Sequence, residues 1–327
     1  MKQITIIHMG GVGDLIQALP LMRAVRIKWP EAHVTLIGRP ERAALAQRAG
    51  LVDACADFDS SGRPAPAAAD LVIDFLGAGP AERGHAARVL TIEPPPPPGW
   101  TGSAAAWILK QGGDALGLPP VPETPEIAIP DTVLDGARAS LAAKGIGGAF
   151  AAIHPGSGSP KKNWPLDRFM EIARRLRQEG RRQVAWLAGP AEAERRTLAP
   201  LGRQETVLAD LALEQAAGVL ALADLYIGND SGITHLAAAV RRPGLPGRRR
   251  RPRHGLPSRL GRAVPGWPCQ GGKPGGRATP TVALFGPTDP RLWAPRGPHV
   301  RIIRSDDGAM NCIDVERVWA EVRAITS

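Results

Sequence analysis

One segment in the second half of the chain has the residue types and spacing of an anion-binding turn. Residues 227–239, IGNDSGITHLAAA, end an apolar run at small and polar residues and then continue with helical spacing. The first backbone N–H groups of a helix lack intrachain partners and carry partial positive charge, which suits a phosphate. Gly232 would let such a ligand approach the backbone. Capping of the helix by Asp230 or Ser231, with no ligand, is an equally open interpretation.

Two further segments repeat this pattern. Residues 154–165, HPGSGSPKKNWP, follow a short apolar run and precede a helix that we expect to begin near Leu166. Residues 8–20, HMGGVGDLIQALP, also read as strand end, glycine turn and helix start. The glycines at 10, 11 and 13 do not fit the G-x-G-x-x-G spacing of a dinucleotide fingerprint. The turn therefore does not predict an NAD or FAD site.

Each of these turns has an ordinary structural interpretation when taken alone. Lys161 and Lys162 are a basic pair of the kind that is usually solvated, and Asp14 is a candidate N-cap of its helix. Three strand–turn–helix units in one chain make anion binding the favoured interpretation, because carboxyl ends of parallel strands meet at one sheet edge.

The remaining pattern is that of an α/β protein. Strands are expected near 3–7, 33–37, 71–75, 89–92, 150–153, 183–187, 206–208, 224–228, 281–285 and 300–303. Helices are expected near 14–28, 40–49, 103–116, 133–144 and 312–325, besides those that follow the turns. Alternation of strands and helices predicts parallel sheets covered on both faces. A chain of 327 residues is long enough for two such domains.

Four motifs in order resemble glycosyltransferase family 9, the ADP-heptose:lipopolysaccharide heptosyltransferases. They are GDLIQALP, HPGSGSPKKNWP, GNDSGITHLAAA and PTVALFGPTDP, the last spanning residues 280–290. The resemblance implies a GT-B fold, in which two doubly wound Rossmann-like domains face each other across a cleft. We expect an acceptor domain at 1–145, a nucleotide-sugar domain at 146–311, and a C-terminal helix at 312–327 that packs back on the first domain.

The resemblance also implies a reaction, the transfer of a heptose from ADP-heptose to a lipopolysaccharide core or lipid A-linked acceptor with inversion. Asp14 matches the family's proposed catalytic base, beside the acceptor-side glycine turn of Gly10, Gly11 and Gly13. Lys162 matches the lysine that family members place on the donor phosphates. Another GT-B enzyme with a different nucleotide sugar, or an inactive nucleotide-binding homologue, are the alternatives.

Further donor-site residues follow from the same resemblance. Ser157 and Gly158 correspond to the phosphate loop, and Asp230, Ser231, Gly232 and His235 to the diphosphate-binding helix start. Glu192 would reach the ribose hydroxyls and the backbone at Leu211 the adenine. A first-turn helix acid is the simpler interpretation of Glu192. His8 and Trp164 are expected to be buried packing residues.

Cofactors and targeting signals are not indicated. The sequence has no Asp-x-Asp dyad beside a donor loop, so we expect metal-independent transfer without a cofactor. Its three cysteines are scattered, which fits a reducing cytosol. No apolar run approaches membrane-spanning length and no secretory signal begins the sequence. We expect a cytoplasmic enzyme with peripheral contact at the inner membrane of a Gram-negative envelope.

The net charge of +10 is concentrated in one place. Eleven Lys and Arg residues and no acidic residue lie between 241 and 277, which leaves the other 290 residues at −1. A broad nucleic-acid-binding face is therefore not predicted. The resemblance places Val240 almost directly before Ala278, so this Arg/Pro/Gly-rich segment is an insertion. A basic surface loop near anionic lipid, a frameshifted piece of coding sequence, and an insertion that damages the enzyme are all open interpretations.

Overall fold

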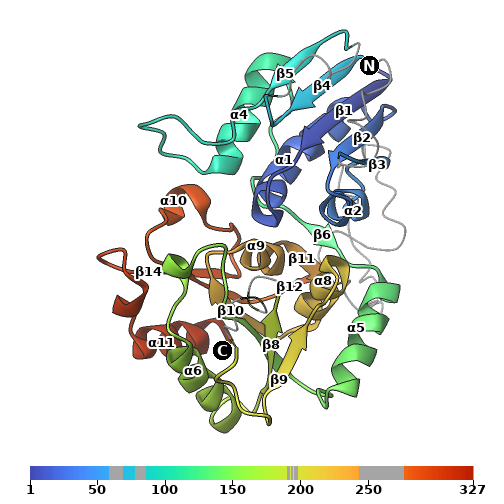
Figure 1. The fold of residues 1–327 in the computed structure, drawn as a ribbon. Helices are drawn as coiled ribbons and strands as arrows, with labels where there is room; N and C mark the ends of the chain where they lie inside the picture. The colour runs from blue at the N-terminus through green and yellow to red at the C-terminus, as the bar shows by residue number, and fades with distance from the viewer. Residues whose placement is uncertain are drawn as a thin grey trace, which may run out of the picture.

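The chain forms two parallel α/β sheets and a third small sheet between them in the computed structural model (Figure 1). The structure describes residues 1–58, 69–77, 86–189, 192, 194, 198–242 and 276–326. Most of the predicted insertion therefore lies outside the described residues.

The first half is a five-stranded parallel sheet with the order β3-β2-β1-β4-β5. Its strands are β1 (Gln3–His8), β2 (His33–Gly38), β3 (Ala54–Asp57), β4 (Leu71–Asp74) and β5 (Val89–Thr91). The helices described here are α1 (Val12–Lys28), α2 (Pro40–Arg48) and α4 (Ala104–Leu116). Helix α4 is capped by Ser103, whose side chain accepts from the backbone N–H of Ala106, and ends at Gly117 in the left-handed conformation.

The second half is a six-stranded parallel sheet with the order β14-β13-β10-β7-β8-β9. Its strands are β7 (Phe150–His154), β8 (Gln183–Ala188), β9 (Thr206–Ala209), β10 (Leu225–Asn229), β13 (Thr281–Phe285) and β14 (Val300–Arg304). The helices are α5 (Asp131–Ala143), α6 (Leu166–Gln178), α8 (Leu213–Leu222), α9 (Gly232–Ala239), α10 (Pro290–Trp293) and α11 (Val315–Thr326), with 3₁₀ turns η1 (Pro160–Lys162) and η2 (Met310–Cys312). Every residue of β7, β10 and β13 is buried, as expected for central strands covered on both faces.

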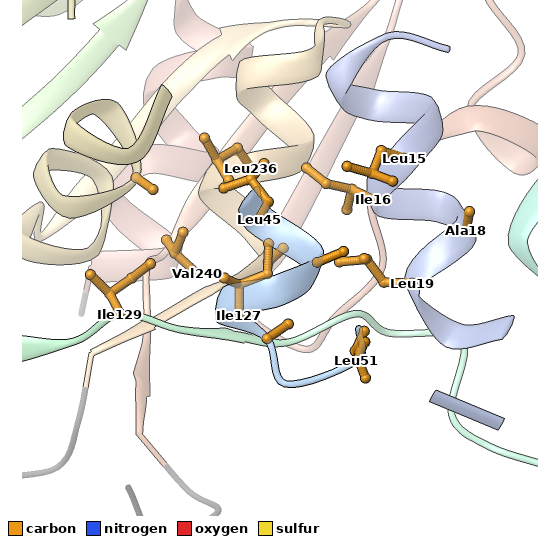
Figure 2. Packing of buried hydrophobic residues seen from close by; sticks show 14 of the residues in the cluster. Leu15, Ile16, Ala18, Leu19, Leu45, Leu51, Ile127, Ile129, Leu236 and Val240 are labelled. Carbon is orange, nitrogen blue, oxygen red and sulfur yellow. The ribbon is translucent and has the colours of Figure 1, made fainter. Parts of the chain in front are cut away.

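The two halves share one apolar core. Helices α1 and α2 of the first half and α8 and α9 of the second contribute buried side chains to a single cluster. Figure 2 shows Leu19 of α1 and Leu45 of α2 in this cluster with Leu236 of α9. Burial of one such side chain stabilises the fold by about 1.5–3 kcal/mol, so this interface fixes how the halves face each other.

The third sheet joins the crossover between the halves to the ends of the predicted insertion. Strand β6 (Ile127–Ala128) pairs in parallel with β11 (Val240–Arg242), and β11 pairs antiparallel with β12 (Arg277–Ala278). Arg241 lies opposite Ala278, so the chain before the segment and the chain after it meet side by side. Both ends of the segment thus leave the fold at one point, next to the expected junction of Val240 and Ala278.

Most predicted elements are present, and two differences have clear physical reasons. Helix α8 was not predicted, because residues 216–221 are buried all round and show no amphipathic period. The four-residue β3 and the short β6, β11 and β12 were also missed. Such short strands depend on pairing partners distant in sequence, which a local pattern does not show.

The C-terminal helix does not pack back on the first half, contrary to our expectation. Val318, Trp319 and Val322 of α11 are buried in a cluster made only of residues from the second half. Helix α11 contacts α6, β13 and β14. The guanidinium of Arg175 on α6 also pairs with the Glu316 carboxylate, at 2.5 Å between Nη2 and Oε1. The apolar stripe of α11 therefore finds its partner beside the sheet that precedes it.

Replacing Gly218 on α8 with Ala should destabilise the protein. A methyl group there would lie 3.0 Å from Cγ1 of Val133 and Cβ of Ala137 on α5. We expect a loss of about 1–3 kcal/mol in urea unfolding, as for other overpacked contacts. The control is Gly136→Ala on α5, where no atom lies within 4 Å and a gain of about 0.5–1 kcal/mol is expected. A Gly218→Ala protein as stable as the wild type would contradict this packing.

Candidate functional site

The starts of helices α1 and α9 touch each other, and this contact brings the two halves together. A methyl group on Gly232 would lie 3.0 Å from Cβ of Val12 and 3.2 Å from the backbone nitrogen of Gly13. One on Gly13 would lie 3.2 Å from Cδ2 of His235. Gly232 is therefore required by packing between the halves, which is a different reason from the close ligand approach that the sequence suggested. Two of the three predicted turns, those at Gly13 and Gly232, lie at this contact.

Asp14 is exposed at the third position of α1, where it forms a hydrogen bond within its own turn. Its Oδ2 accepts from the backbone N–H of Gly11 at 2.7 Å, so Asp14 caps the helix from within its first turn, but the N-cap is Gly11 and not Asp14 as the sequence suggested. Arg42 of α2 stabilises the turn, because its guanidinium donates to the carbonyl of Gly10 at 2.7 Å. A methyl group on Gly10 would lie 2.8 Å from Cβ of Asp14. The turn thus fixes the carboxylate at the edge of the first sheet.

Lys162 and Asp230 form an ion pair on the other side of the contact. The ammonium of Lys162, one-third exposed, donates to Oδ2 of Asp230 at 2.7 Å. The Asp230 side chain is 9% exposed, and its backbone N–H donates to the carbonyl of Leu284. Asp230 therefore has no backbone N–H to offer a ligand, and its carboxylate holds the lysine in place. The neighbouring Lys161 is exposed.

His235 lies near these charged groups and next to Gly13. Burial lowers the pKa of its imidazole, and the nearby carboxylates of Asp230 and Asp14 oppose that effect without reversing it. The Lys162 ammonium lowers the pKa further. The ring is therefore neutral at pH 7. Asp14 from one half and Lys162 from the other both influence the pKa of this ring, and Gly13, next to Asp14, faces it.

The first turn of helix α9 is capped by a side chain and still has backbone N–H groups that can donate to a ligand. The Ser231 hydroxyl is the N-cap and accepts from the backbone N–H of Thr234 at 3.3 Å. Thr234 in turn donates its hydroxyl to the carbonyl of Asn229. A single cap satisfies only one of the orphan N–H groups of a helix start, which leaves those of Gly232 and Ile233 for an anion. The two interpretations of this turn are therefore compatible.

A buried asparagine that the sequence analysis did not single out holds the neighbouring loop. The Asn229 amide donates to the carbonyl of Pro155 at 2.7 Å, and its Oδ1 accepts from the backbone N–H of Trp164 at 3.0 Å. Both ends of the loop after β7 are thus tied to the end of β10. Trp164 is 1% exposed and packs edge-on against Phe169, as expected.

The predicted phosphate-loop residues Ser157 and Gly158 differ in their surroundings. Ser157 is buried, with its hydroxyl oxygen 2.6 Å from Oδ1 of Asn163 and 2.7 Å from the carbonyl oxygen of Ser159. Gly158 is exposed, and a methyl group on it would meet no atom within 4 Å. Ser157 therefore shapes the loop, and no steric reason requires glycine at 158.

Glu192 is helical and accepts a hydrogen bond from three residues earlier, as a first-turn helix acid does, and it is also buried beside His154. Its Oε2 lies 3.4 Å from Nε2 of His154 and accepts from the backbone N–H of Gly189 at 2.8 Å. Burial raises the pKa of this carboxyl, but the hydrogen bonds from His154 and Gly189 outweigh it and hold the pKa below its usual range. Nδ1 of His154 lies 3.4 Å from the Ser231 hydroxyl oxygen. His154 thus links Glu192 to the start of α9. The position of His154 at the end of a predicted strand was the signal that could have identified it as a site residue.

Leu211 and His8 lie at the margins of this arrangement. Leu211 is half-buried after β9 and follows Asp210, which has a φ of 58°. His8 at the end of β1 is buried against Phe75, with ring centroids 5.0 Å apart, as expected. Burial lowers the pKa of His8 to about 4, although the nearby Asp14 carboxylate raises it.

The described residues include no cluster of three or more His, Cys, Asp or Glu side chains suited to a metal ion. Metal-independent transfer remains a prediction. None of the helices in the described part of the chain is long and apolar enough to cross a membrane.

Residues 114–246 match the model of glycosyltransferase family 9 (heptosyltransferase). Lipopolysaccharide heptosyltransferase 2 of Salmonella typhimurium is 27% identical over 151 residues, which is 44% of this chain and 33% of that protein. The chain thus matches about a third of the length of the curated relatives found.

Two solved structures share the whole fold. The crystal structure of the glycosyl transferase family 9 from Veillonella parvula has a TM-score of 0.73 at 17% identity, covering 99% of this chain and 97% of that one. Escherichia coli ADP-heptose lps heptosyltransferase II has a TM-score of 0.70 at 19% identity, covering 100% and 98%. The expected GT-B fold with two Rossmann-like domains is confirmed. The exact domain limits stay predictions.

Replacing His8 with a residue that does not titrate should weaken the pH dependence of the free energy of unfolding at acidic pH. Between pH 6.5 and 4 the unfolded chain binds a proton at His8 that the folded protein does not, so stability falls as pH falls through this window. The predicted loss is about 3 kcal/mol. The free energy of unfolding of His8→Phe can be measured in urea at several pH values. Between pH 6.5 and 4 it should fall by about 3 kcal/mol less than that of the wild type. Parallel profiles for the two proteins would contradict the buried neutral histidine.

Proposed function

We propose that this chain, which belongs to glycosyltransferase family 9, is an inverting glycosyltransferase that moves a heptose from ADP-heptose to a lipopolysaccharide inner-core acceptor. The observation that carries the proposal is the contact between the starts of α1 and α9. It packs the turn that carries Asp14, an exposed carboxylate of the first half, against the start of α9 in the second half, where Lys162 pairs with Asp230. A base and an anion site in one place are what sugar transfer from a nucleoside diphosphate needs.

The donor would bind to the second half. The N–H groups of Gly232 and Ile233 and the Lys162 ammonium would hold the diphosphate, with Ser157, Gly158 and Ser231 shaping the loops around it. Asp230 acts through Lys162 in this scheme, since a carboxylate in contact with a diphosphate would repel it. Glu192 and Leu211 remain proposed for the nucleoside. The solved relative named for ADP-heptose supports adenine over other bases.

The chemistry would be a single displacement at the anomeric carbon. The acceptor hydroxyl oxygen forms a bond to this carbon as the bond to the diphosphate oxygen breaks, and the hydroxyl proton passes to Asp14. The electron pair of the broken bond leaves on ADP. Charge on this leaving group grows in the transition state, so Lys162 and the start of α9 stabilise the transition state more than bound donor. Neutral His235 adds no second positive charge beside Asp14.

The acceptor would approach from the first half, past the turn of Gly10, Gly11 and Gly13. A lipid-linked acceptor implies a cytoplasmic enzyme that visits the cytoplasmic face of the inner membrane. The proposal needs no nucleic acid, metal or cofactor.

Two substitutions separate the proposed roles. With ADP-heptose and heptose-deficient lipopolysaccharide, Asp14→Asn should lower kcat by about 10²–10⁴-fold, because the base is lost. Lys162→Met should lower kcat by about 10²–10³-fold through loss of charge on the leaving group. Lys161→Met is the matched control and should stay within about two-fold of the wild type. ADP release and the mass of the product report the reaction.

Thermal unfolding checks donor binding in the same proteins. ADP at about 100 times its Kd should add roughly 2.7 kcal/mol to the wild type and to Asp14→Asn, and much less to Lys162→Met. Equal stabilisation by UDP or GDP would point to a different nucleotide sugar. An Asp14→Asn enzyme with the wild-type rate would contradict the proposed base.

A further inference from the structure

A buried histidine at the end of a central strand lies between two groups of the proposed donor site. His154 ends β7, and the sheet order puts β7 between β10 and β8. Ser231 follows β10 and Glu192 follows β8, so the two groups lie on opposite sides of this histidine. The strand order also reverses between β7 and β10, which is where doubly wound sheets bind their ligands. His154 thus lies at the ligand-binding position of the sheet, although the proposed chemistry assigns it no role.

Both ring nitrogens of His154 have a partner. Nε2 lies 3.4 Å from Oε2 of Glu192, and Nδ1 lies 3.4 Å from the Ser231 hydroxyl oxygen. An ionised carboxylate can only accept, so in the neutral ring the proton is on Nε2 and Nδ1 is an acceptor. Ser231 therefore donates its hydroxyl proton to His154. The same oxygen accepts from the backbone N–H of Thr234, so the hydroxyl is held between the ring and the first turn of α9.

Two glycines make room for Glu192 beside this ring. A methyl group on Gly156 would collide with the Glu192 carboxyl group, and one on Gly189 would lie 3.1 Å from its Oε2. The backbone N–H of Gly189 donates to the same oxygen at 2.8 Å. The Glu192 side chain is 6% exposed, so its carboxylate has little freedom to move. The carboxylate is therefore fixed between the two loops and the imidazole of His154.

His154 can influence a bound nucleotide only through its neighbours. The residue is 4% exposed, which leaves it no surface for direct contact with a ligand. Glu192 is proposed for the nucleoside, and Ser231 lies at the helix start proposed for the diphosphate. A nucleoside diphosphate spans both groups, so the ring that joins them sets the spacing at which its two parts are bound. Groups that are already correctly spaced need less ordering when the ligand binds.

We propose that His154 is a positioning residue of the donor site, a buried ring that holds Glu192 and Ser231 at the spacing of the two parts of a nucleoside diphosphate. The inference rests on the proposed function, since it takes Glu192 for the nucleoside and the start of α9 for the diphosphate. A histidine that only filled the core would not make the effects of Glu192 and Ser231 on binding depend on each other. The two roles therefore differ in a measurable coupling.

A double-mutant cycle measures this coupling. The probe is whichever of ADP, UDP and GDP binds the wild type most tightly, and its Kd is measured by calorimetry. Glu192→Ala and Ser231→Ala are made singly and together, with either His154 or His154→Phe. With His154 present, the double variant should bind about 5-fold or more tightly than the product of the single effects predicts, because loss of either partner already frees the ring. With His154→Phe the effects should multiply to within about 2-fold.

The single variants give a graded result. His154→Phe should raise the Kd by about 10-fold, and His154→Gln, which keeps a donor towards Glu192, by about 3-fold. Gly156→Ala should raise it by about 5-fold, because the methyl group displaces the Glu192 carboxylate while every polar group stays in the chain. Gly147→Ala, where no atom lies within 4 Å, is the matched control and should keep the wild-type Kd. If His154→Phe does not fold, Gly156→Ala takes its place in the cycle.

Effects of Glu192→Ala and Ser231→Ala that multiply in the presence of His154 would overturn the inference and leave His154 as a core residue, even in an active transferase. Coupling that depends on His154 in a protein without transfer activity would contradict the proposed function, and the positioning role would stand. A wild type that binds none of the three nucleotides would overturn both.

Discussion

The contact between Gly13 at the start of α1 and Gly232 at the start of α9 is the constraint on which the rest of the site depends. Neither position has room for an added methyl group at ordinary contact distance. The contact persists because the same two helices continue into one apolar core, where Leu19 and Leu236 are buried together (Figure 2). Packing energy far from the surface thus sets the spacing of two polar helix starts.

Electrostatics at this contact follow from burial. His235 is neutral because desolvation outweighs two nearby carboxylates, so Lys162 is the cation placed beside the helix start. Asp230 pairs with that lysine and keeps it from moving freely into solvent. A pre-oriented cation and fixed N–H groups need little reorganisation when negative charge develops on a leaving group. The arrangement is therefore suited to stabilising a departing diphosphate.

The sequence predicted those features that depend on residues close to one another in the chain. The three glycine turns read as strand, turn and helix, and each lies at the carboxyl end of its strand as expected. The hydrogen bonds between segments far apart in sequence could not be predicted in this way. Asn229 bonds to a loop 65 or more residues away, and Glu192 meets His154 only after the strands pair. The all-round burial of α8 and the docking of α11 on α6 also depend on tertiary packing.

The most direct test of this account is the transfer rate of Gly13→Ala. A methyl group 3.2 Å from the His235 ring displaces that ring or the helix starts by a few tenths of an ångström and leaves every proposed catalytic group in the chain. The account predicts a fall in kcat of about 10-fold or more, with stabilisation by ADP retained. Gly113→Ala on α4, where no atom lies within 4 Å, should transfer at the wild-type rate. Wild-type transfer by Gly13→Ala would contradict the claim that this contact sets the geometry of the site.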